Sequence, residues 1–272
     1  MIETPLQEKL HRLEQLLAAQ QSLLIAFSGG VDSSFLLTVA ANVLQKNVVA
    51  LMTVSPATPP EDAQRATLLA DELQVRLIKI PHNELAIPQY AANPKNRCYF
   101  CKDSLYEICQ HEAERLALKA IADGVNVDDL NDYRHGLQAA DEYAILHPLV
   151  DAGFTKVDIR QGSKLLGLAT WDRPASPCLS SRVPYGNAIT AAMLSQIAQG
   201  EGLLRSQGFR EVRLRHHGKT ARIEIARTDL STFVSPDMIK RIGAAIREIG
   251  FDYVGIDLAG YKMGILNESR PN

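Results

Sequence analysis

A run of small and hydroxyl-bearing residues follows an apolar segment near the start of the chain. The apolar segment is Leu23–Phe27, and the run that follows it is Ser28-Gly29-Gly30-Val31-Asp32-Ser33-Ser34. The segment predicts a buried strand, and the apolar spacing after the run predicts an amphipathic helix. A glycine pair allows the positive φ of a tight turn, while N–H groups at the helix start and serine hydroxyls suit an anion. The run therefore predicts a phosphate or pyrophosphate site, with an ordinary serine-capped turn as the alternative.

Three of the four cysteines are placed where they could hold a metal centre. Cys98 and Cys101 form a CxxC pair, and Cys178 lies far downstream in a proline-rich stretch. Three thiolates suit an iron–sulfur cluster with one iron left open, or a zinc ion with an open position. A redox CxxC pair without Cys178, and separate buried thiols, are alternatives that the spacing leaves open. Cys109 falls inside a predicted helix and is expected to be a packing residue.

Arginines in the last third of the chain suit a small anion. Arg213 and Arg215 alternate along a predicted strand, so both side chains leave the same face of it. A guanidinium group binds two oxygens of a phosphate at once, although a solvated strand face is the alternative. Glu201 and Glu224 could serve a cation, but surface carboxylates are the commoner explanation for them.

The elements that must position these residues alternate between strands and helices. Predicted strands at 23–27, 48–54, 75–80 and 120–122 are separated by predicted helices. This alternation predicts an α/β fold with a doubly wound, mostly parallel sheet. Ligands bind such sheets beyond the carboxyl ends of the strands. There the run at 28–34, the loop from Thr53 and the carboxylate-rich loop Asp123–Arg134 should converge, although a solvated turn is the alternative for the last of these.

A proline-rich segment, Trp171–Gly186, separates this sheet from a smaller predicted α+β unit. We expect two domains, residues 1–170 and 171–272. The 29 Lys and Arg residues against 31 Asp and Glu leave a net charge of −2, too little positive charge for a nucleic-acid surface. No signal pattern and no membrane-length apolar run is present. We therefore expect a cytoplasmic protein with no membrane or nucleic-acid partner, whose cysteines are thiols or metal ligands.

The run at 28–34 resembles the SGGxDS loop of the PP-loop ATP pyrophosphatases, which split ATP between the α- and β-phosphates and adenylate a substrate. It differs from a Walker loop because the Walker lysine is missing. The loop Asp123–Gly136, the run Cys178-Leu179-Ser180-Ser181-Arg182-Val183-Pro184-Tyr185-Gly186, and Arg213 with Arg215 narrow the resemblance. Together, over residues 20–262, they resemble the ATP-dependent sulfur transferase family LarE.

The resemblance implies a role in the synthesis of the nickel-pincer nucleotide. Members convert carboxylates of pyridinium-3,5-biscarboxylic acid mononucleotide into thiocarboxylates, using ATP and Mg²⁺. By this resemblance the ATP-binding residues are Ser28, Gly29, Gly30, Val31, Asp32, Ser33, Ser34, Thr53, Asp128 and Arg134. The substrate phosphate would be held by Ser181, Arg182, Arg213 and Arg215, and Glu201 with Glu224 would lie near a metal.

The cysteines resemble those of a cluster-bearing subtype. In that subtype three cysteines, here Cys98, Cys101 and Cys178, hold a 4Fe–4S cluster whose open iron carries sulfide taken from a donor. Other members sacrifice a cysteine sulfur instead. Family members form hexamers, which implies a homo-oligomer. The sequence departs from the family pattern at two places. His135 stands where a proline is common, and the family can have an acidic residue near Thr232, where the nearest one here is Asp229.

Two other functions are consistent with the same loop. A tRNA-thiolating PP-loop enzyme also joins this loop to cluster cysteines, but it carries zinc-ribbon segments that are missing here. A non-catalytic ATP-binding module needs neither pyrophosphate release nor three thiolates. A glutaminase domain, which amide-forming ligases require, is missing as well.

Overall fold

The computed structural model describes residues 4–131 and 135–261, and these divide into two compact units. The first unit contains Met1–Glu84 and Asn96–Ser176, and the second contains Leu85–Lys95 and Pro177–Asn272. The predicted domains, residues 1–170 and 171–272, stay a prediction.

Four parallel strands form the sheet of the first unit, in the order β3-β2-β1-β4. They are β1 (Leu23–Ala26), β2 (Val48–Val54), β3 (Arg76–Pro81) and β4 (Ala120–Ala122). The central strand β1 is buried along its whole length, as expected of a parallel strand covered on both faces. The predicted α/β fold with a parallel sheet is confirmed.

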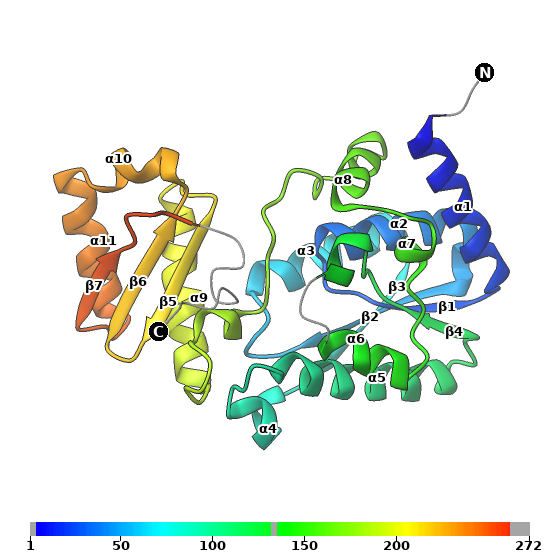
Figure 1. The fold of residues 1–272 in the computed structure, drawn as a ribbon, viewed down its shortest axis with the longest axis horizontal. Helices are drawn as coiled ribbons and strands as arrows, with labels where there is room; N and C mark the ends of the chain where they lie inside the picture. The colour runs from blue at the N-terminus through cyan, green and yellow to red at the C-terminus, as the bar shows by residue number, and fades with distance from the viewer. Residues whose placement is uncertain (1–3, 132–134, 262–272) are drawn as a thin grey trace. The chain divides into compact units, whose positions relative to one another are not determined.

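Helices cover both faces of this sheet (Figure 1). They are α1 (Pro5–Ala19), α2 (Val31–Leu44), α3 (Pro60–Glu72), α5 (Arg97–Arg115), α6 (His135–Glu142), α7 (Pro148–Asp151) and α8 (Lys156–Leu165), with 3₁₀ turns at Gln45–Asn47 (η1), Glu84–Ala86 (η2) and Val127–Asn131 (η3). Of the helices in the described ranges, none is long and apolar enough to cross a membrane.

The alternation of side chains along β1 explains the two layers of helices. Leu23 and Ile25 point into one apolar cluster with α1, α2 and α8. Leu24 and Ala26 point into a second cluster with α5 and α6. Successive side chains of a strand face opposite sides, so one four-residue strand anchors both layers.

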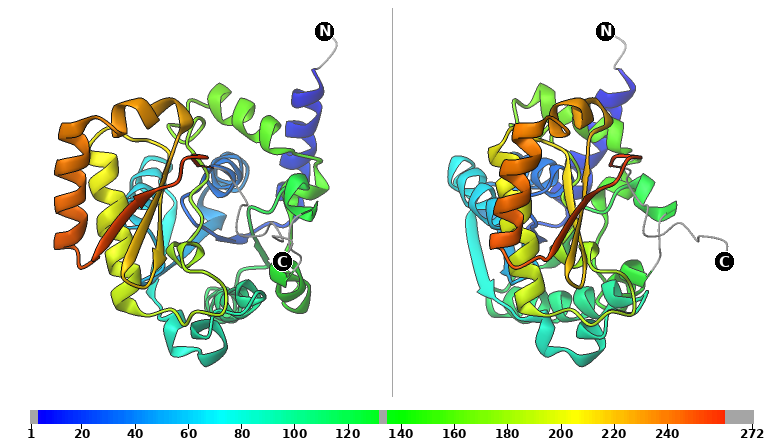
Figure 2. Two further views of the ribbon diagram at one scale, coloured as in Figure 1. Left: turned by 60° about the vertical axis from the view of Figure 1, so that its left-hand side comes forward. Right: turned by 90° about the vertical axis from the view of Figure 1, so that its left-hand side faces the viewer.

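The second unit is built on a three-stranded sheet, in the order β5-β6-β7. Strands β5 (Val212–His217) and β6 (Thr220–Ile225) are antiparallel, and β7 (Tyr253–Ile256) pairs parallel with β6. Its helices are α4 (Pro88–Ala91), α9 (Ala191–Ser206), α10 (Leu230–Phe233) and α11 (Pro236–Glu248), with 3₁₀ turns at Leu179–Arg182 (η4) and Arg227–Asp229 (η5). Figure 2 shows α9 and α11 together on one side of this sheet.

A glycine in α9 allows close packing on that side. A Cβ atom at Gly200 would lie 2.2 Å from Leu214 Cδ1 and 3.3 Å from Ile246 Cδ1. Leu214 therefore faces the helices, and Arg213 and Arg215, its neighbours in β5, leave the opposite face. The strand thus separates an apolar side from a charged side.

The short segment around α4 belongs to the second unit although it interrupts the first in sequence. The buried Asn93 side-chain amide donates to the carbonyl oxygens of Val183, Pro184 and Asn187, the last two at 2.8 and 3.0 Å. The hydroxyls of Tyr90 and Ser180 lie 2.5 Å apart. These hydrogen bonds tie α4 to the loop that contains η4.

Candidate active site

The predicted phosphate run forms a turn at the carboxyl end of β1. Gly29 has a φ of +70°, and a Cβ atom there would lie 2.9 Å from the carbonyl oxygen of Asp62 in α3. Gly30 is the N-cap of α2 and makes no side-chain cap, so N–H groups of the first turn are available to an anion. The hydroxyls of Ser28 and Ser33 lie 3.0 Å apart across the turn. The turn has the shape and the donors of an anion seat.

A lysine at the start of α8 joins this turn to the carboxylate-rich loop. The Lys156 ammonium group donates to Asp32 Oδ2, and the Lys156 backbone N–H donates to Asp128 Oδ2 at 2.7 Å. The other Asp32 oxygen, Oδ1, is buried and has no hydrogen-bond partner in the described ranges. A buried, unpartnered carboxylate oxygen beside an anion seat is suited to a divalent cation that arrives with a nucleotide.

Asp129 adds a second carboxylate near this point. Burial raises the pKa of Asp129, and the negative charges of Asp32 and Asp123 raise it further. Carboxylates that disfavour one another's ionised form are favourable surroundings for a cation. Thr53 lies near the carboxyl end of β2 and pairs with Ile80 of β3. Arg134, predicted to bind ATP, lies outside the described residues.

A buried charge network around Asp123 was not predicted from the sequence. Asp123 follows β4, is 2% exposed, and accepts hydrogen bonds from Tyr106 Oη at 2.6 Å and from His147 Nδ1 at 2.8 Å. The Lys102 ammonium group lies 3.7 Å from the same carboxylate. The available signal was an aspartate at a strand's carboxyl end followed directly by a glycine, Gly124.

The contacts of Asp123 and His147 favour the charged form of each. Burial acts to raise the pKa of Asp123, but the hydrogen bond from His147 and the positive charge of Lys102 lower it to about 2. Burial acts to lower the pKa of His147, and the hydrogen bond and charge of Asp123 outweigh it and raise that pKa. The network therefore places a carboxylate, an ammonium group and an imidazole beside the anion seat.

His147→Gln is expected to make the protein less stable by about 1–3 kcal/mol near pH 6, the usual effect of losing a hydrogen bond to a charged group. The folded-state pKa of His147 is raised, so its contribution is complete below the unfolded value of about 6.5 and is lost as pH rises through the raised pKa. Urea denaturation of both proteins across this range measures the difference. An equal difference at high pH would contradict the charged pair.

Gly124→Ala is expected to weaken ATP binding by about tenfold or more, because small displacements of positioning groups are costly. A Cβ atom at Gly124 would lie 2.8 Å from the backbone nitrogen of Ser33, so the first turn of α2 would have to move. The measurement is the KM for ATP. Gly202→Ala is the control, since a Cβ atom there meets nothing within 4 Å.

The predicted cluster cysteines lie in different units. Cys98 and Cys101 are the second and fifth residues of α5, three residues apart and therefore on one face, with Cys98 exposed. Cys178, in the second unit, directly precedes η4 and is half-buried. None of the four cysteines is in a disulfide. In the described ranges, no three His, Cys, Asp or Glu side chains are grouped to hold a metal ion.

Cys109 differs from the other three. It is fully buried against α6, and burial raises the pKa of its thiol to about 12. It is a packing residue, as predicted.

The loop after Cys178 is held by a buried arginine. Arg182 is 1% exposed, and its Nε and Nη2 atoms donate to Glu201 at 2.7 and 2.9 Å. Its Nη1 atom donates to Ser181 Oγ at 2.8 Å and to the carbonyl oxygens of Pro177 and Cys178 at 2.7 and 3.1 Å. One guanidinium thus fixes the backbone on both sides of the Cys178 side chain.

Two further arginines lie beside the same loop. Arg215 donates to both oxygens of Glu224, at 3.0 and 2.7 Å, and to the Ser181 carbonyl oxygen at 2.9 Å. Arg213 is 5% exposed, and burial lowers its pKa, with the charges of Arg182 and Arg215 lowering it further. The structure therefore brings together all four residues predicted to bind the substrate phosphate. Like charges this close favour a bound anion.

The two glutamates predicted to lie near a metal are buried in this cluster. Glu201 also accepts from Arg205 at 2.8 Å and from the Leu214 backbone N–H at 3.1 Å. Glu224 also pairs with Arg222 at 3.0 Å. Both glutamates are fully buried. A cation at either carboxylate would have to displace a guanidinium group, and the metal role stays a prediction.

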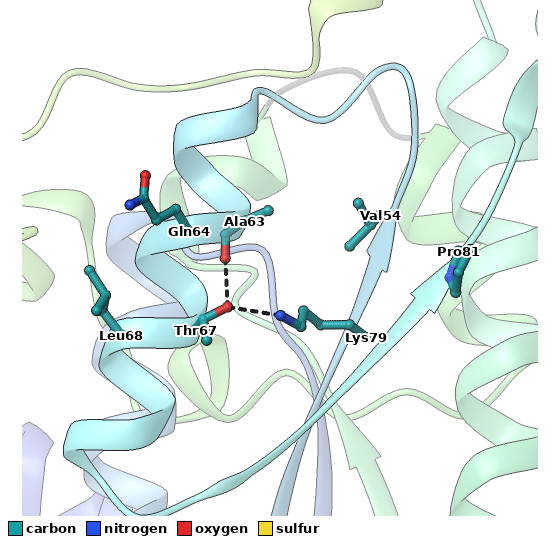
Figure 3. Close-up of a pocket in the computed structure, with 7 residues that line it drawn as sticks. All are labelled: Val54, Ala63, Gln64, Thr67, Leu68, Lys79 and Pro81. Carbon is teal, nitrogen blue, oxygen red and sulfur yellow. Dashed lines mark hydrogen bonds between the residues drawn. The ribbon is translucent and has the colours of Figure 1, made fainter.

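The first unit also has a groove that is lined by none of the predicted site residues. It lies between α3 and the ends of β2 and β3, has a volume of about 540 Å³, and is mostly apolar. Figure 3 shows Lys79 reaching across it to the Thr67 hydroxyl, at 3.3 Å. Its lining residues are Val54, Ala63, Gln64, Thr67, Leu68, Lys79 and Pro81.

Comparison with known proteins agrees with this geometry. Residues 6–97 match the family model of NAD synthase. Over 262 residues the chain is 43% identical to an uncharacterised protein of Synechocystis sp., covering 96% of this chain and 98% of that protein. An uncharacterised protein of Methanocaldococcus jannaschii is 29% identical over 244 residues, covering 89% of this chain and 91% of that protein.

The name of a third relative states what that protein makes. The pyridinium-3,5-bisthiocarboxylic acid mononucleotide synthase of Lactiplantibacillus plantarum is 34% identical over 250 residues, which cover 92% of this chain and 90% of that enzyme. The similarity extends over nearly the whole length of both chains. This chain belongs to the LarE family of pyridinium-3,5-bisthiocarboxylic acid mononucleotide synthases, and its first part is an NAD synthase-like PP-loop domain.

Proposed function

We propose that the protein is an ATP-dependent sulfur transferase that adenylates carboxylates of pyridinium-3,5-biscarboxylic acid mononucleotide and converts them to thiocarboxylates. The observation that carries this proposal is that Arg182 and Arg215 both donate to Ser181, with the charge of Arg213 close to both, in a chain similar along its length to a synthase of the thiocarboxylate product. The PP-loop in the first unit supplies the nucleotide chemistry.

Adenylation solves the problem that a carboxylate is a poor electrophile. A carboxylate oxygen attacks the α-phosphorus of ATP, the bond to the bridging oxygen of the β-phosphate breaks, and pyrophosphate leaves. The N–H groups and hydroxyls of the turn at 28–34 would bind the pyrophosphate. Lys156 is hydrogen-bonded to Asp32 at this turn and would supply the positive charge that a lysine provides in Walker loops. A sulfur nucleophile then attacks the acyl carbon, and AMP leaves.

The substrate would be anchored through its phosphate by Ser181, Arg182, Arg213 and Arg215. Glu201 and Glu224 orient two of these guanidinium groups through paired hydrogen bonds. Such fixed donors bind a phosphate without paying again for side-chain ordering. Burial and the positive charges of Arg182 and Arg215 lower the pKa of Arg213. A bound phosphate would stabilise the charged form of Arg213 and offset the repulsion between the three arginines.

We propose that Cys98, Cys101 and Cys178 are the ligands of a 4Fe–4S cluster. Cys98 and Cys101 present two thiols on one face of a helix end, and none of the three is in a disulfide. When bound, the cluster would supply an iron position for sulfide from a donor. This chain's own contribution is the Arg182 guanidinium, which holds the Cys178 backbone in place. A hexameric assembly and the identity of the donor stay predictions.

The deciding experiment is an anaerobic reaction of the protein with ATP, Mg²⁺, sulfide and the biscarboxylic mononucleotide, followed by mass spectrometry. The expected product has one oxygen exchanged for sulfur, with one pyrophosphate and one AMP formed per exchange. A parallel reaction replaces the mononucleotide with unmodified tRNA. Sulfur in the tRNA and none in the mononucleotide would favour a tRNA-thiolating enzyme, and ATP binding without pyrophosphate would favour a non-catalytic module.

A further inference from the structure

A tyrosine near the end of the described chain lies on the arginine cluster. Tyr261 follows β7 and the turn after it, and its hydroxyl oxygen accepts a hydrogen bond from Arg213 Nη2 at 3.2 Å. The Arg213 guanidinium carbon lies 4.7 Å from the centre of the Tyr261 ring, a cation–π distance. Tyr261 therefore contacts Arg213 through both its hydroxyl and its ring.

The backbone fixes this tyrosine in place. Gly260 has a φ of +74°, and a Cβ atom there would lie 2.8 Å from Arg227 Cγ and 3.0 Å from the Ile225 carbonyl oxygen. The Tyr261 N–H donates to that same carbonyl at 2.7 Å. Only a glycine fits this close reversal, which returns the chain from β7 to the end of β6 and delivers the phenol to Arg213.

The Tyr261 hydroxyl can still donate one hydrogen bond. Its oxygen accepts from Arg213, so its own hydrogen is available to an acceptor. In the described ranges Arg213 is the single hydrogen-bond partner of the Tyr261 hydroxyl. A phosphate bound at Arg213 would bring negatively charged oxygens to the same place, and an O–H group donating to such an oxygen makes a strong hydrogen bond.

We propose that Tyr261 is a further substrate-binding residue, whose hydroxyl donates to the phosphate monoester held by Ser181 and the arginines. The inference rests on the phosphate role proposed above for that cluster. It adds a neutral donor to three cations, and it makes the turn at Gly260 part of the substrate site.

The test is calorimetric titration of the full-length protein with nicotinic acid mononucleotide, which carries a pyridinium ring and a ribose 5′-phosphate. Tyr261→Phe keeps the ring over Arg213 and removes the hydroxyl. We expect its Kd to be about tenfold higher than that of the wild type, the usual effect of losing one hydrogen bond to a charged group. Inorganic phosphate as a competitor should show a similar loss, which places the contact at the phosphate.

Two arginine variants separate this inference from the proposed function. Arg213→Lys should weaken mononucleotide binding, and adding Tyr261→Phe to it should weaken binding further. Wild-type affinity in Arg213→Lys would overturn the phosphate site and the proposed function with it. Weakened Arg213→Lys but wild-type affinity in Tyr261→Phe would overturn the Tyr261 inference alone. So would a Tyr261→Phe effect that disappears in the double variant, since the hydroxyl would then act only through Arg213. Melting temperatures confirm that each variant is folded.

Discussion

Arg182→Met is expected to lower the free energy of unfolding by about 3–5 kcal/mol, because it removes the buried partner of Glu201 and leaves that buried charge to the more exposed Arg205. The guanidinium is 1% exposed and its partner Glu201 is fully buried. The substitution also removes three hydrogen bonds that hold the backbone at Pro177 and Cys178 and the Ser181 hydroxyl. Urea denaturation followed by circular dichroism measures the loss.

Two companion variants identify the cause. Arg205 donates to the same glutamate but its side chain is 31% exposed, so Arg205→Met should cost only about 0–1 kcal/mol. In Arg182→Met/Glu201→Gln the buried charge is gone, and the amide oxygen still accepts from the Leu214 N–H. We expect this double variant to recover most of the lost stability. If it is no more stable than Arg182→Met, the buried charge is not the reason.

Cys98→Ala is expected to remove most of the bound iron from anaerobically purified protein and to lower repeated turnover more than about 100-fold. The physical reason is that the proposed three-thiolate site would lose a direct ligand, whereas changes to the surroundings of metal ligands already cost about 10–100-fold. Cys98 is exposed at the start of α5, so its replacement by alanine should leave the fold intact. The measurements are iron and sulfide per chain, and thiocarboxylate formed per chain.

Cys109 offers a matched control on the same helix. Its thiol is fully buried, and burial raises its pKa to about 12, so it is a poor metal ligand. Cys109→Ala should keep its iron and its turnover, with some loss of stability from the cavity. Unchanged iron in Cys98→Ala would rule out the three-cysteine site. A single turnover that consumes Cys178 would instead indicate a sacrificial cysteine.

The local features of the site were readable from the residues alone. The strand at 23–27, the glycine pair and the helix after Ser34 follow from apolar spacing and turn chemistry, which depend on neighbours in sequence. The α/β class followed from the alternation of such segments. The pairing of Arg213 and Arg215 on one face followed from the two-residue period of a strand.

Other parts were decided by contacts between residues far apart in the chain. The Asp123 network joins β4 to Lys102 and His147, and the α4 segment joins the second unit through the Asn93 side chain. Neither leaves a periodic pattern, because each depends on a single polar side chain meeting distant partners.

The arginine cluster shows both kinds of information. The sequence by itself determined which residues are proposed to carry the chemistry: the turn at 28–34, the thiols, and the arginines of β5. Only the tertiary structure decided how they are held, with Glu201 on Arg182, Glu224 on Arg215 and Tyr261 on Arg213. The reason is physical. Charge and hydrogen-bonding capacity belong to each side chain, but burial and pairing exist only after distant segments have packed together.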